Sequence, residues 1–479
     1  MNYTDFLLMG PEIALVLALV IMFVADFILH KSESKCKSLF SLMLVLMVVS
    51  LCGTFCTSAG HPEPISAFGG LYVASPAVNV MKSILTFGTI IVVLMAQPWV
   101  EKTQRLAGEF YMLTISTLLG MFVMMSSGNF LLFFLGLETA SVPLACMVAF
   151  DKWKKDSAEG AAKYILVATF SSGVMLYGIS FIYAATGTLY FDDVATTITV
   201  SPLAIMGLVF FFSGLGFKIS LVPFHFWTAD TYQGAPTPVT GYLSVISKGA
   251  AALTLCIILM KVFQPLVAYW EYLLYIVIVL SITVANLFAI RQSELKRFMA
   301  FSSISQAGYI MLAVVGNGQL GVASLTYYVL VYIVANMAVF TVINVVEQKN
   351  GGRTDMAAYN GFYQTNPKLS FLMTLALFSL AGIPPFAGMF SKFFVFMAAA
   401  QQGSAAAYFV VFIALINTVV SLYYYLLIVK AMYITKTDTP LPTFKSDCST
   451  RTALAVCTAG IALCGIVSCI YEWIAAAGL

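Results

Sequence analysis

The sequence predicts an all-α polytopic membrane protein with about fourteen transmembrane helices. Of its 479 residues, 61% are hydrophobic and only 9% are charged, whereas about 25% of the residues of an average soluble domain are charged. Long apolar runs recur along the whole chain, and no polar stretch between them is long enough to fold separately in water. We therefore expect a single membrane domain, residues 1–479.

A transmembrane helix needs about 20 mainly apolar residues, and this length gives the positions of the spans, which are numbered in chain order. The first begins at Pro11 and has neither a basic segment before it nor a small-residue cleavage site after it. We expect it to be retained rather than removed as a signal peptide. The expected spans are 11–29, 38–57, 76–96, 109–126, 129–150, 158–185, 202–228, 238–260, 268–290, 297–315, 320–346, 369–400, 404–430 and 452–475.

The lysines and arginines of the loops test this topology, because short cytoplasmic loops are enriched in basic residues. Nearly all of them fall in the odd-numbered loops, and the even-numbered loops hold Lys261 alone. An error of one span early in the chain would mix the two sets. We therefore expect both termini on the non-cytoplasmic side. The net charge of +3 is then a consequence of topology and does not indicate nucleic-acid binding.

Two spans contain prolines in their middle, Pro223 in 202–228 and Pro384 with Pro385 in 369–400. Proline interrupts helical hydrogen bonding, which is tolerated at membrane depth only where protein or cavity water satisfies the freed groups. Interrupted helices in two halves of a chain are typical of inverted-repeat transporters. We expect discontinuous spans 7 and 12 and two inverted five-helix repeats. The chain would divide into spans 1–3 (1–108), a first repeat of spans 4–8 (109–262), a second repeat of spans 9–13 (263–434) and span 14 (435–479).

Five lysines remain inside the predicted spans, and each costs at least about 2.5 to 3.5 kcal/mol at the centre of a lone helix. Lys82 lies six residues after Pro76, so its long side chain could reach the outer interface, and we favour that structural interpretation. Lys163 lies near the cytoplasmic end of its span, where an interfacial and a functional position are equally compatible with the sequence. The other three are Lys218, Lys248 and Lys392.

These three lysines lie too deep in their spans to reach either membrane surface. A permanent ion pair is the alternative to a functional role, and for Lys218 the partner would be Glu138, the one acidic residue in the middle of a predicted span. Burial lowers the pKa of a lysine and a nearby carboxylate raises it, so moving the carboxylate or its proton makes a lysine bind or release a proton. Glu138, Lys218, Lys248 and Lys392 therefore predict a proton relay.

Polar residues at helical spacing lie beside the buried lysines. A single stripe of this kind often serves only for hydrogen bonding between helices, but four stripes favour a hydrated interior. His225, just after the proline break, could titrate near neutral pH or satisfy carbonyls freed at the break. The stripes are Ser244, Ser247 and Lys248; Ser302, Ser305 and Gln306; Tyr328, Tyr332 and Asn336; and Asn417, Ser421 and Tyr425.

The nine cysteines form no C-x-x-C pair. Metal or iron–sulfur ligation needs convergent thiolates at close spacing, so we interpret these residues as small buried side chains. The sequence also has no glycine-rich phosphate loop after a strand pattern. We expect no metal site and no bound cofactor in this chain.

Three segments resemble the proton-translocating, antiporter-like subunits of respiratory complex I: GLGFKISLVPFHFWTADTYQGAPTPVTGYLSVISKGAA, LKRFMAFSSISQAGYIML and SLAGIPPFAGMFSKFFVF. The similarity covers nearly the whole chain, and the first segment is highly specific to the superfamily. The N-terminal segment LLMGPEIALVLALVIMFVADFIL and a lysine in span 12 favour one branch of the family over its sister subunit M, which has a glutamate there.

The resemblance implies a hydrated axis of charges across the bilayer midplane of a bacterial inner (plasma) membrane protein. Glu138 would be the span 5 glutamate paired with Lys218, Lys248 the central lysine and Lys392 the exit lysine. Lys163 matches a lysine of span 6, and with His225 and Gln306 it would form a secondary proton path. Gln306 departs from the family, since many relatives have histidine there. Glutamine cannot titrate, so water would have to carry a proton past it.

The resemblance also implies partners. NADH, flavin, iron–sulfur clusters and quinone would belong to other subunits, and subunit M and the small subunit K would be neighbours. The chain would be part of a translocating enzyme without performing redox chemistry itself. Two other functions fit the same residues: a cation/proton antiporter without redox coupling, and a passive scaffold of the membrane arm.

Overall fold

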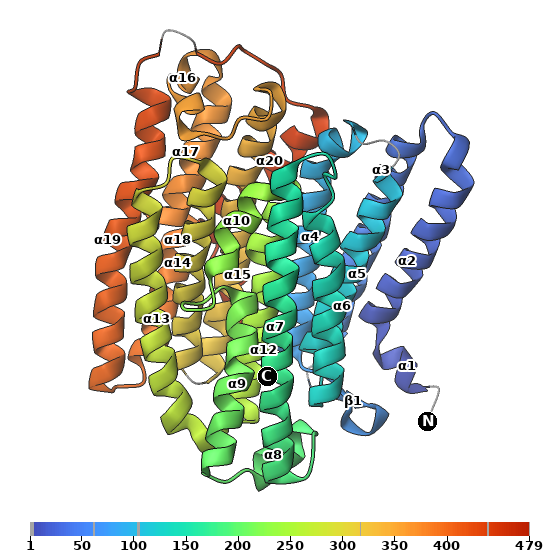
Figure 1. Cartoon of the computed structure of the whole chain (residues 1–479), viewed down its shortest axis with the longest axis vertical. Coiled ribbons are helices and arrows are strands. Elements are labelled where there is room, and N and C mark those ends of the chain that lie inside the picture. The colour runs from blue at the N-terminus through green and yellow to red at the C-terminus, as the bar shows by residue number, and fades with distance from the viewer. Residues whose placement is uncertain (1–3, 61–62, 103–105, 317, 438–439, 479) are drawn as a thin grey trace.

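The computed structural model describes residues 4–60, 63–102, 106–316, 318–437 and 440–478. It is a bundle of long, roughly aligned helices (Figure 1). Thirteen helices of the described part are long and apolar enough to span a membrane, and two shorter apolar helices, Pro367–Ala381 and Ala387–Ala400, follow one another as the halves of a further span. The predicted fold class is confirmed, with discontinuous spans 7 and 12. The division into two inverted repeats stays a prediction.

The helices closely follow the predicted spans. Spans 1–6 are α2 (Gly10–Ile28), α3 (Lys35–Gly60), α4 (Pro76–Lys102), α5 (Ala107–Met125), α6 (Phe130–Val148) and α7 (Lys155–Thr186). Span 7 is α9 (Pro202–Ile219) with α10 (Phe226–Gly234), and span 8 is α11 (Thr237–Tyr242), a π-helical turn (Leu243–Ser247) and α12 (Lys248–Lys261). Spans 9–14 are α13 (Val267–Ile290), α14 (Leu295–Val315), α15 (Gln319–Lys349), α17 (Pro367–Ala381) with α18 (Ala387–Ala400), α19 (Ala405–Tyr433) and α20 (Cys448–Ile466).

Short elements lie at the ends of the bundle: α1 (Thr4–Leu8), α8 (Phe191–Thr197), α16 (Phe362–Thr365), α21 (Cys469–Ala476) and the antiparallel strands β1 (Ile65–Ala67) and β2 (Tyr72–Ala74). In Figure 1, α16 and the start of α20 lie at the top, whereas α1, β1 and α8 lie at the bottom. The strands were not predicted.

Span 14 is shorter than predicted. The helix α20 ends at Ile466 because Val467 adopts an extended conformation, and α21 follows as a separate helix. Tyr471 of α21 stacks on Phe394 of α18, with 3.8 Å between ring centroids. This aromatic contact holds α21 against the bundle and replaces the expected continuation of the span to residue 475.

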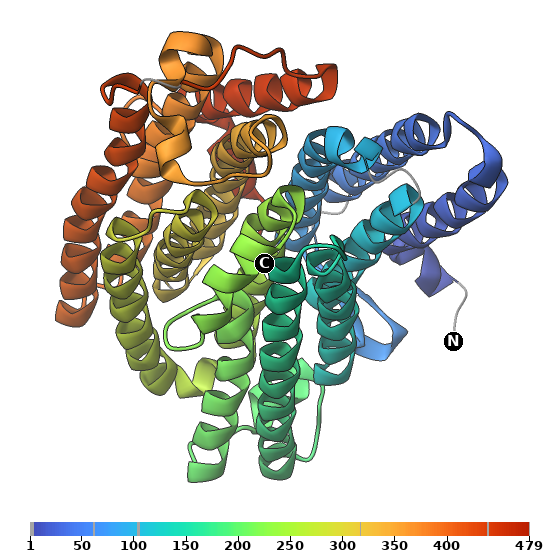
Figure 2. The same cartoon turned by 45° about the horizontal axis from the view of Figure 1, so that its top comes forward.

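The centre of the bundle is formed by α4, α12, α14 and α15, whose apolar windows are almost entirely buried. Only 28% of the apolar window is buried in each of the outer helices α2, α3 and α19, as expected for helices that face lipid. The pair α2 and α3 lies at the opposite edge of the molecule from α19 (Figure 2). Polar side chains on the central helices are therefore shielded from the hydrocarbon on all sides.

Two glycines bring α5 and α6 into backbone contact. A Cβ atom at Gly120 would lie 2.3 Å from the backbone nitrogen of Ala140, and a Cβ atom at Gly136 would lie 2.4 Å from the backbone nitrogen of Met124. No larger residue fits these positions without separating the helices. Small residues at such crossings are typical of tightly packed membrane helices.

Candidate functional site

The break of span 7 lies between α9 and α10. The first half ends at Ile219 because Ser220 adopts a left-handed backbone conformation, with φ of 67°, and Pro223 supplies no backbone N–H to continue the helix. The N–H of Val222 instead donates to Ser281 Oγ at 2.9 Å. Protein groups thus replace water at this break, as membrane depth requires.

Lys218 lies in the last turn of α9, directly before the break, and is buried. Its ammonium group donates to Ser141 Oγ of α6 at 2.8 Å and to the Tyr164 hydroxyl of α7 at 3.0 Å. Both partners are neutral oxygens. Three helices therefore converge on one cation without neutralising it.

Glu138 lies one turn before Ser141 on α6, and its carboxylate accepts a hydrogen bond from Ser172 Oγ at 2.5 Å. The expected direct ion pair with Lys218 does not occur among the described residues. The carboxylate still acts electrostatically on the ammonium group. The prediction of a direct pair was wrong because hydroxyl groups satisfy both charges separately.

A small cavity of about 10 Å³ lies beside Lys218 and is also lined by Ser172, the residue that donates to Glu138. Such a space holds roughly one water molecule. Its walls include Ser141, Ser171, Ser172 and Lys218, together with apolar residues of α6, α7 and α9. One water here would have hydroxyl partners on several sides.

Lys248 follows directly after the π-helical turn Leu243–Ser247. Such turns occur frequently at functional sites. The buried ammonium group of Lys248 donates to Ser303 Oγ at 2.6 Å, and the hydroxyl of Tyr232 lies 3.3 Å from the same Ser303 oxygen. The central lysine is thus linked to α10 and α14 through one serine.

Residues of the predicted polar stripes form hydrogen bonds with one another near Lys248. Asn336 of α15 donates to Ser244 Oγ at 2.6 Å, and Ser302 of α14 lies 2.5 Å from the Tyr425 hydroxyl of α19. Asn417 has a different partner, because its side-chain oxygen accepts a hydrogen bond from Asn286 of α13 at 3.0 Å. All four stripes therefore contribute polar groups to this interior, the fourth through Tyr425.

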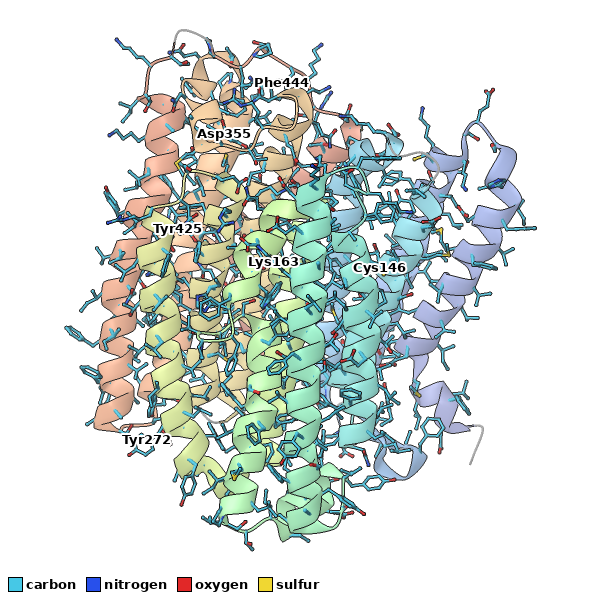
Figure 3. All side chains as sticks on the ribbon, in the orientation of Figure 1. Cys146, Lys163, Tyr272, Asp355, Tyr425 and Phe444 are labelled. Atoms are coloured by element: carbon cyan, nitrogen blue, oxygen red, sulfur yellow. The ribbon has the colours of Figure 1, made fainter. Side chains whose placement is uncertain are left out.

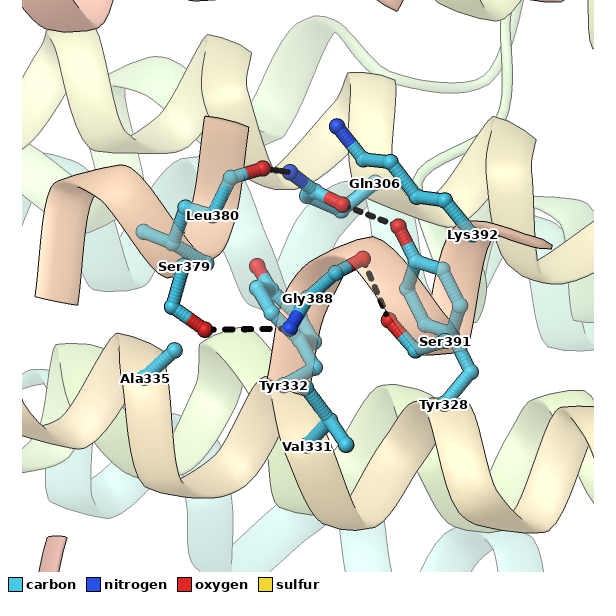
Figure 4. A pocket seen from close by; sticks show the side chains of 10 residues that line it. All are labelled: Gln306, Tyr328, Val331, Tyr332, Ala335, Ser379, Leu380, Gly388, Ser391 and Lys392. Carbon is cyan, nitrogen blue, oxygen red and sulfur yellow. Dashed lines mark hydrogen bonds between the residues drawn. The ribbon is translucent and has the colours of Figure 1, made fainter. Parts of the chain in front are cut away.

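Gln306 continues this interior toward span 12. Its amide nitrogen donates to the Tyr425 hydroxyl at 3.2 Å and to the Leu380 carbonyl at 3.3 Å, and its amide oxygen accepts from the Tyr328 hydroxyl. Figure 4 shows Gln306 and Lys392 lining the same small cavity of about 10 Å³. The glutamine side chain is held in place by three partners.

Lys392 lies in α18, after the break of span 12. Its buried ammonium group donates to the Ala381 carbonyl at 3.0 Å, and Ala381 is the last residue of α17. The carbonyl end of a helix carries partial negative charge and stabilises a cation. Gly382 (φ 88°) permits the close approach, because a Cβ atom there would lie 3.1 Å from the Lys392 side chain.

Lys163 lies at the rim and not in this interior. Its ammonium group forms ion pairs at 2.6 Å with Glu159 and with Asp230 of α10, and 43% of its side chain is exposed. Arg297 of α14 binds the other oxygen of Asp230 at 2.6 Å. Asp230 was not among the predicted site residues, although it joins α7, α10 and α14 at this end.

His225 is buried directly before α10, and its ring packs on Phe226 with 4.6 Å between centroids. Both interpretations of this histidine stay predictions. Lys296, assigned to a loop from the sequence, is instead buried, and its ammonium group donates to the Ala235 carbonyl at 2.8 Å. Arg291 and Arg297 lie close to it in the sequence, so Lys296 resembled one of the basic residues of a cytoplasmic loop.

Lys82 contradicts the favoured interpretation of an interfacial lysine. It is fully buried, and its ammonium group lies 2.6 Å from a carboxylate oxygen of Glu12 in the first turn of α2. The hydroxyl of Tyr72 in β2 joins the pair, 3.2 Å from Lys82 and 3.1 Å from Glu12. The signal for this pair was a lone glutamate directly after Pro11 in an apolar run.

Comparisons with known proteins agree with this architecture. Residues 127–421 match the family described as NADH:quinone oxidoreductase/Mrp antiporter, TM. NADH-quinone oxidoreductase subunit N of Phocaeicola vulgatus is 57% identical over 474 residues, covering 98% of both chains. The same subunit of Azobacteroides pseudotrichonymphae is 48% identical over 478 residues, covering 99% of this chain and 98% of the relative.

Solved structures give the same result. A chain of respiratory complex I from Thermus thermophilus superimposes with a TM-score of 0.81 at 30% identity, over 98% of this chain and 100% of that one. A chain of the Mrp complex from Dietzia sp. superimposes with a TM-score of 0.87 over 100% of this chain and 97% of that one. The latter is only 19% identical and therefore supports the fold alone.

Proposed function

Because the chain belongs to the NADH-quinone oxidoreductase subunit N family, we infer that it is a proton-translocating membrane-arm subunit of respiratory complex I. In this function, NADH-to-quinone electron transfer in other subunits drives protons outward across the membrane. Each proton moved against about 100 mV costs about 2.3 kcal/mol. That energy must reach this chain from its partners.

One observation carries the proposed path. Lys218, Lys248 and Lys392 are buried, and each is held by hydroxyl or carbonyl oxygens instead of a carboxylate among the described residues. A lysine in a permanent ion pair is fixed in its charged form, whereas a lysine held by neutral oxygens can lose its proton. This pattern supports the three lysines as proton carriers.

We propose that Glu138 acts as an electrostatic trigger. When the carboxylate is charged it stabilises the ammonium form of Lys218, and when it is protonated or displaced that stabilisation is lost. A released proton would pass by Lys248 toward Lys392. Gln306 would orient neighbouring hydroxyl groups and water along this path through its hydrogen bonds. Lys163 and His225 would belong to an entry path from the rim.

The assembly follows from the same proposal. The chain would lie in a bacterial inner membrane with both termini on the non-cytoplasmic side, beside subunits M and K. NADH, flavin, iron–sulfur clusters and quinone would be bound by other subunits. The two halves, 109–262 and 263–434, would be inverted repeats, each with one broken helix at the midplane. The break in each half of the structure supports this division.

A cation/proton antiporter without redox coupling is the less favoured function. The same lysines and broken helices would serve it. Similarity to an Mrp complex reaches only 19% identity, however, whereas relatives named subunit N reach 57% and 48%. The level of identity therefore favours the redox-coupled complex.

The Lys218→Ala variant tests the relay in the assembled complex. We expect NADH-driven proton uptake by inverted membrane vesicles to fall roughly a hundred-fold, the low end of the contribution of a positioned acid–base group. The matched control is Lys349→Ala, which removes an exposed lysine at the end of α15. Unchanged pumping by an assembled Lys218→Ala complex would support a passive scaffold and contradict the relay.

A further inference from the structure

A large groove lies between α17 and α20 and shares no lining residue with the cavities at Lys218 and Lys392. Its volume is about 960 Å³. Both helices begin at its mouth, α17 at Pro367 and α20 at Cys448. Figure 3 labels Phe444, one of the lining residues, at the top of the bundle. The groove therefore opens at one membrane surface and continues into the membrane-spanning layer.

The mouth of the groove is suited to an anion. Lys368, Lys445 and Arg451 line it, all three are exposed, and none forms an ion pair with a carboxylate in the described part of the chain. The first N–H groups of α17 and α20 lie at the same end. Helix N-termini and basic side chains together favour phosphate groups.

The mouth is held in a defined shape. Asn366, directly before α17, donates to the Pro442 carbonyl at 3.1 Å and accepts from the Phe444 N–H at 3.2 Å. The Thr443 hydroxyl donates to the Thr365 carbonyl at 3.1 Å. The loop that carries Lys445 is thereby fastened to the start of α17, and the three cations are brought to one place.

The walls below the mouth are apolar. They include Leu372 of α17 and Leu454, Ala459 and Ala462 of α20. Arg451 and Ala462 are separated by eleven residues of helix, about 16 Å at 1.5 Å per residue. This length matches one leaflet of a hydrocarbon core about 30 Å thick.

We propose that this groove binds an anionic phospholipid, with its phosphate at Lys368, Lys445 and Arg451 and an acyl chain along Leu372, Leu454 and Ala459. A free phosphate would contact only the basic residues at the mouth and would leave the apolar walls of the groove without a partner. A helix of a partner protein would meet three uncompensated cations at the mouth. A lipid with an acidic head group satisfies both ends of the groove, and basic pockets between membrane helices are known to bind such head groups.

Photolabelling of the whole complex in nanodiscs tests the head-group site. The probes are phosphatidylglycerol and phosphatidylcholine that carry the same diazirine on the acyl chain. We expect phosphatidylglycerol to label α20, and the variant Lys368→Gln/Lys445→Gln/Arg451→Gln to reduce this labelling at least about ten-fold, since each basic residue near a membrane surface contributes about 1 kcal/mol.

The matched control is Lys349→Gln/Lys430→Gln/Lys436→Gln. It removes the same charge from exposed lysines near the same end of the bundle but outside the groove, and it should label like the native complex. Equal labelling by both lipids, or equal loss in both triple variants, would overturn the proposal, because a general surface potential would then explain the binding.

A second measurement tests the acyl-chain site. Ala459 is exposed on the wall of the groove, so Ala459→Phe should fill it without disturbing the core and should lower phosphatidylglycerol labelling. Benzoyl-phenylalanine at position 459 should form a lipid adduct in the native complex. A cross-link to a partner subunit in place of lipid would show a protein occupant and overturn the proposal.

Discussion

Buried lysines occur in two regions of this protein, and their partners differ. In the N-terminal helices, Lys82 lies 2.6 Å from the carboxylate of Glu12. In the central bundle, Lys218 and Lys248 donate to serine hydroxyls at 2.8 Å and 2.6 Å. Lys392 donates to the Ala381 carbonyl at 3.0 Å.

This difference separates structural charges from charges that can change. A carboxylate in direct contact strongly favours the ammonium form, so Lys82 keeps its proton and joins α4 to α2. Hydroxyl and carbonyl oxygens accept hydrogen bonds from an ammonium group without a full opposite charge. The central lysines can therefore exchange protons, and burial alone does not distinguish the two kinds of lysine.

The largest expected effect is the loss of stability when the ion pair between Glu12 and Lys82 is broken. Lys82→Met leaves the Glu12 carboxylate buried and uncompensated, and removing one partner of a buried ion pair destabilises a protein by about 3 to 5 kcal/mol. We expect a lower unfolding temperature of the solubilised complex and less assembled complex in the membrane. Pumping per assembled complex should stay near the native value.

The double variant Glu12→Gln/Lys82→Met is the control for this experiment, because it removes both charges and should recover part of the lost stability. If Lys82→Met instead reduced pumping per complex as far as Lys218→Ala, the pair would belong to the proton path and the distinction between the two regions would fail.

A smaller effect is expected from Glu138→Gln. The carboxylate acts on Lys218 without direct contact, and two charges roughly 8 to 16 Å apart interact by about 1 to 2 kcal/mol at an effective dielectric constant of about 20. We expect pumping to fall about ten-fold while quinone reduction is less affected. Ser172→Ala keeps the charge but removes its hydrogen bond, so it should have the weaker effect; the reverse order would contradict an electrostatic trigger.

The smallest effect is expected from Gln306→His. An unperturbed histidine is protonated below about pH 6.5, and here it would place a second positive charge in the cavity that Lys392 lines. Burial beside the cationic Lys392 disfavours the charged form of such a histidine, so the pumping rate relative to the native complex should stay constant from pH 8 to about pH 6.5 and fall about two-fold toward pH 5. Methionine cannot titrate, so the pumping rate of Gln306→Met relative to the native complex should not depend on pH.

The sequence predicted the spans and both helix breaks because apolar length and proline are local signals. Lys218, Lys248 and Lys392 were found because charge is rare in such segments. These features depend only on neighbouring residues in the chain, so the structure differs from the prediction mainly at helix ends such as Ile466.

Partners across the bundle could not be predicted. Glu12 lies 70 residues before Lys82 in the sequence, and the contact depends on how α2 packs on α3 and α5. Ser141 and Ser172 separate Glu138 from Lys218 because each hydroxyl reaches one charge first. Lys296 looked like a loop lysine because basic neighbours surround it in the sequence, although the fold buries it.

The backbone contact of α5 and α6 at Gly120 and Gly136 restricts how the trigger can move. Two helices that touch through their main chains cannot slide or rotate past each other without a steric collision. Glu138 lies on α6 within a turn of this contact, so its carboxylate can change position by rotation about its own side-chain torsions or by movement of α5 and α6 as one unit. Protonation of Glu138 needs no helix movement, whereas a change in its distance from Lys218 without such a side-chain rotation would have to come from motion of α9 relative to the joined pair α5 and α6.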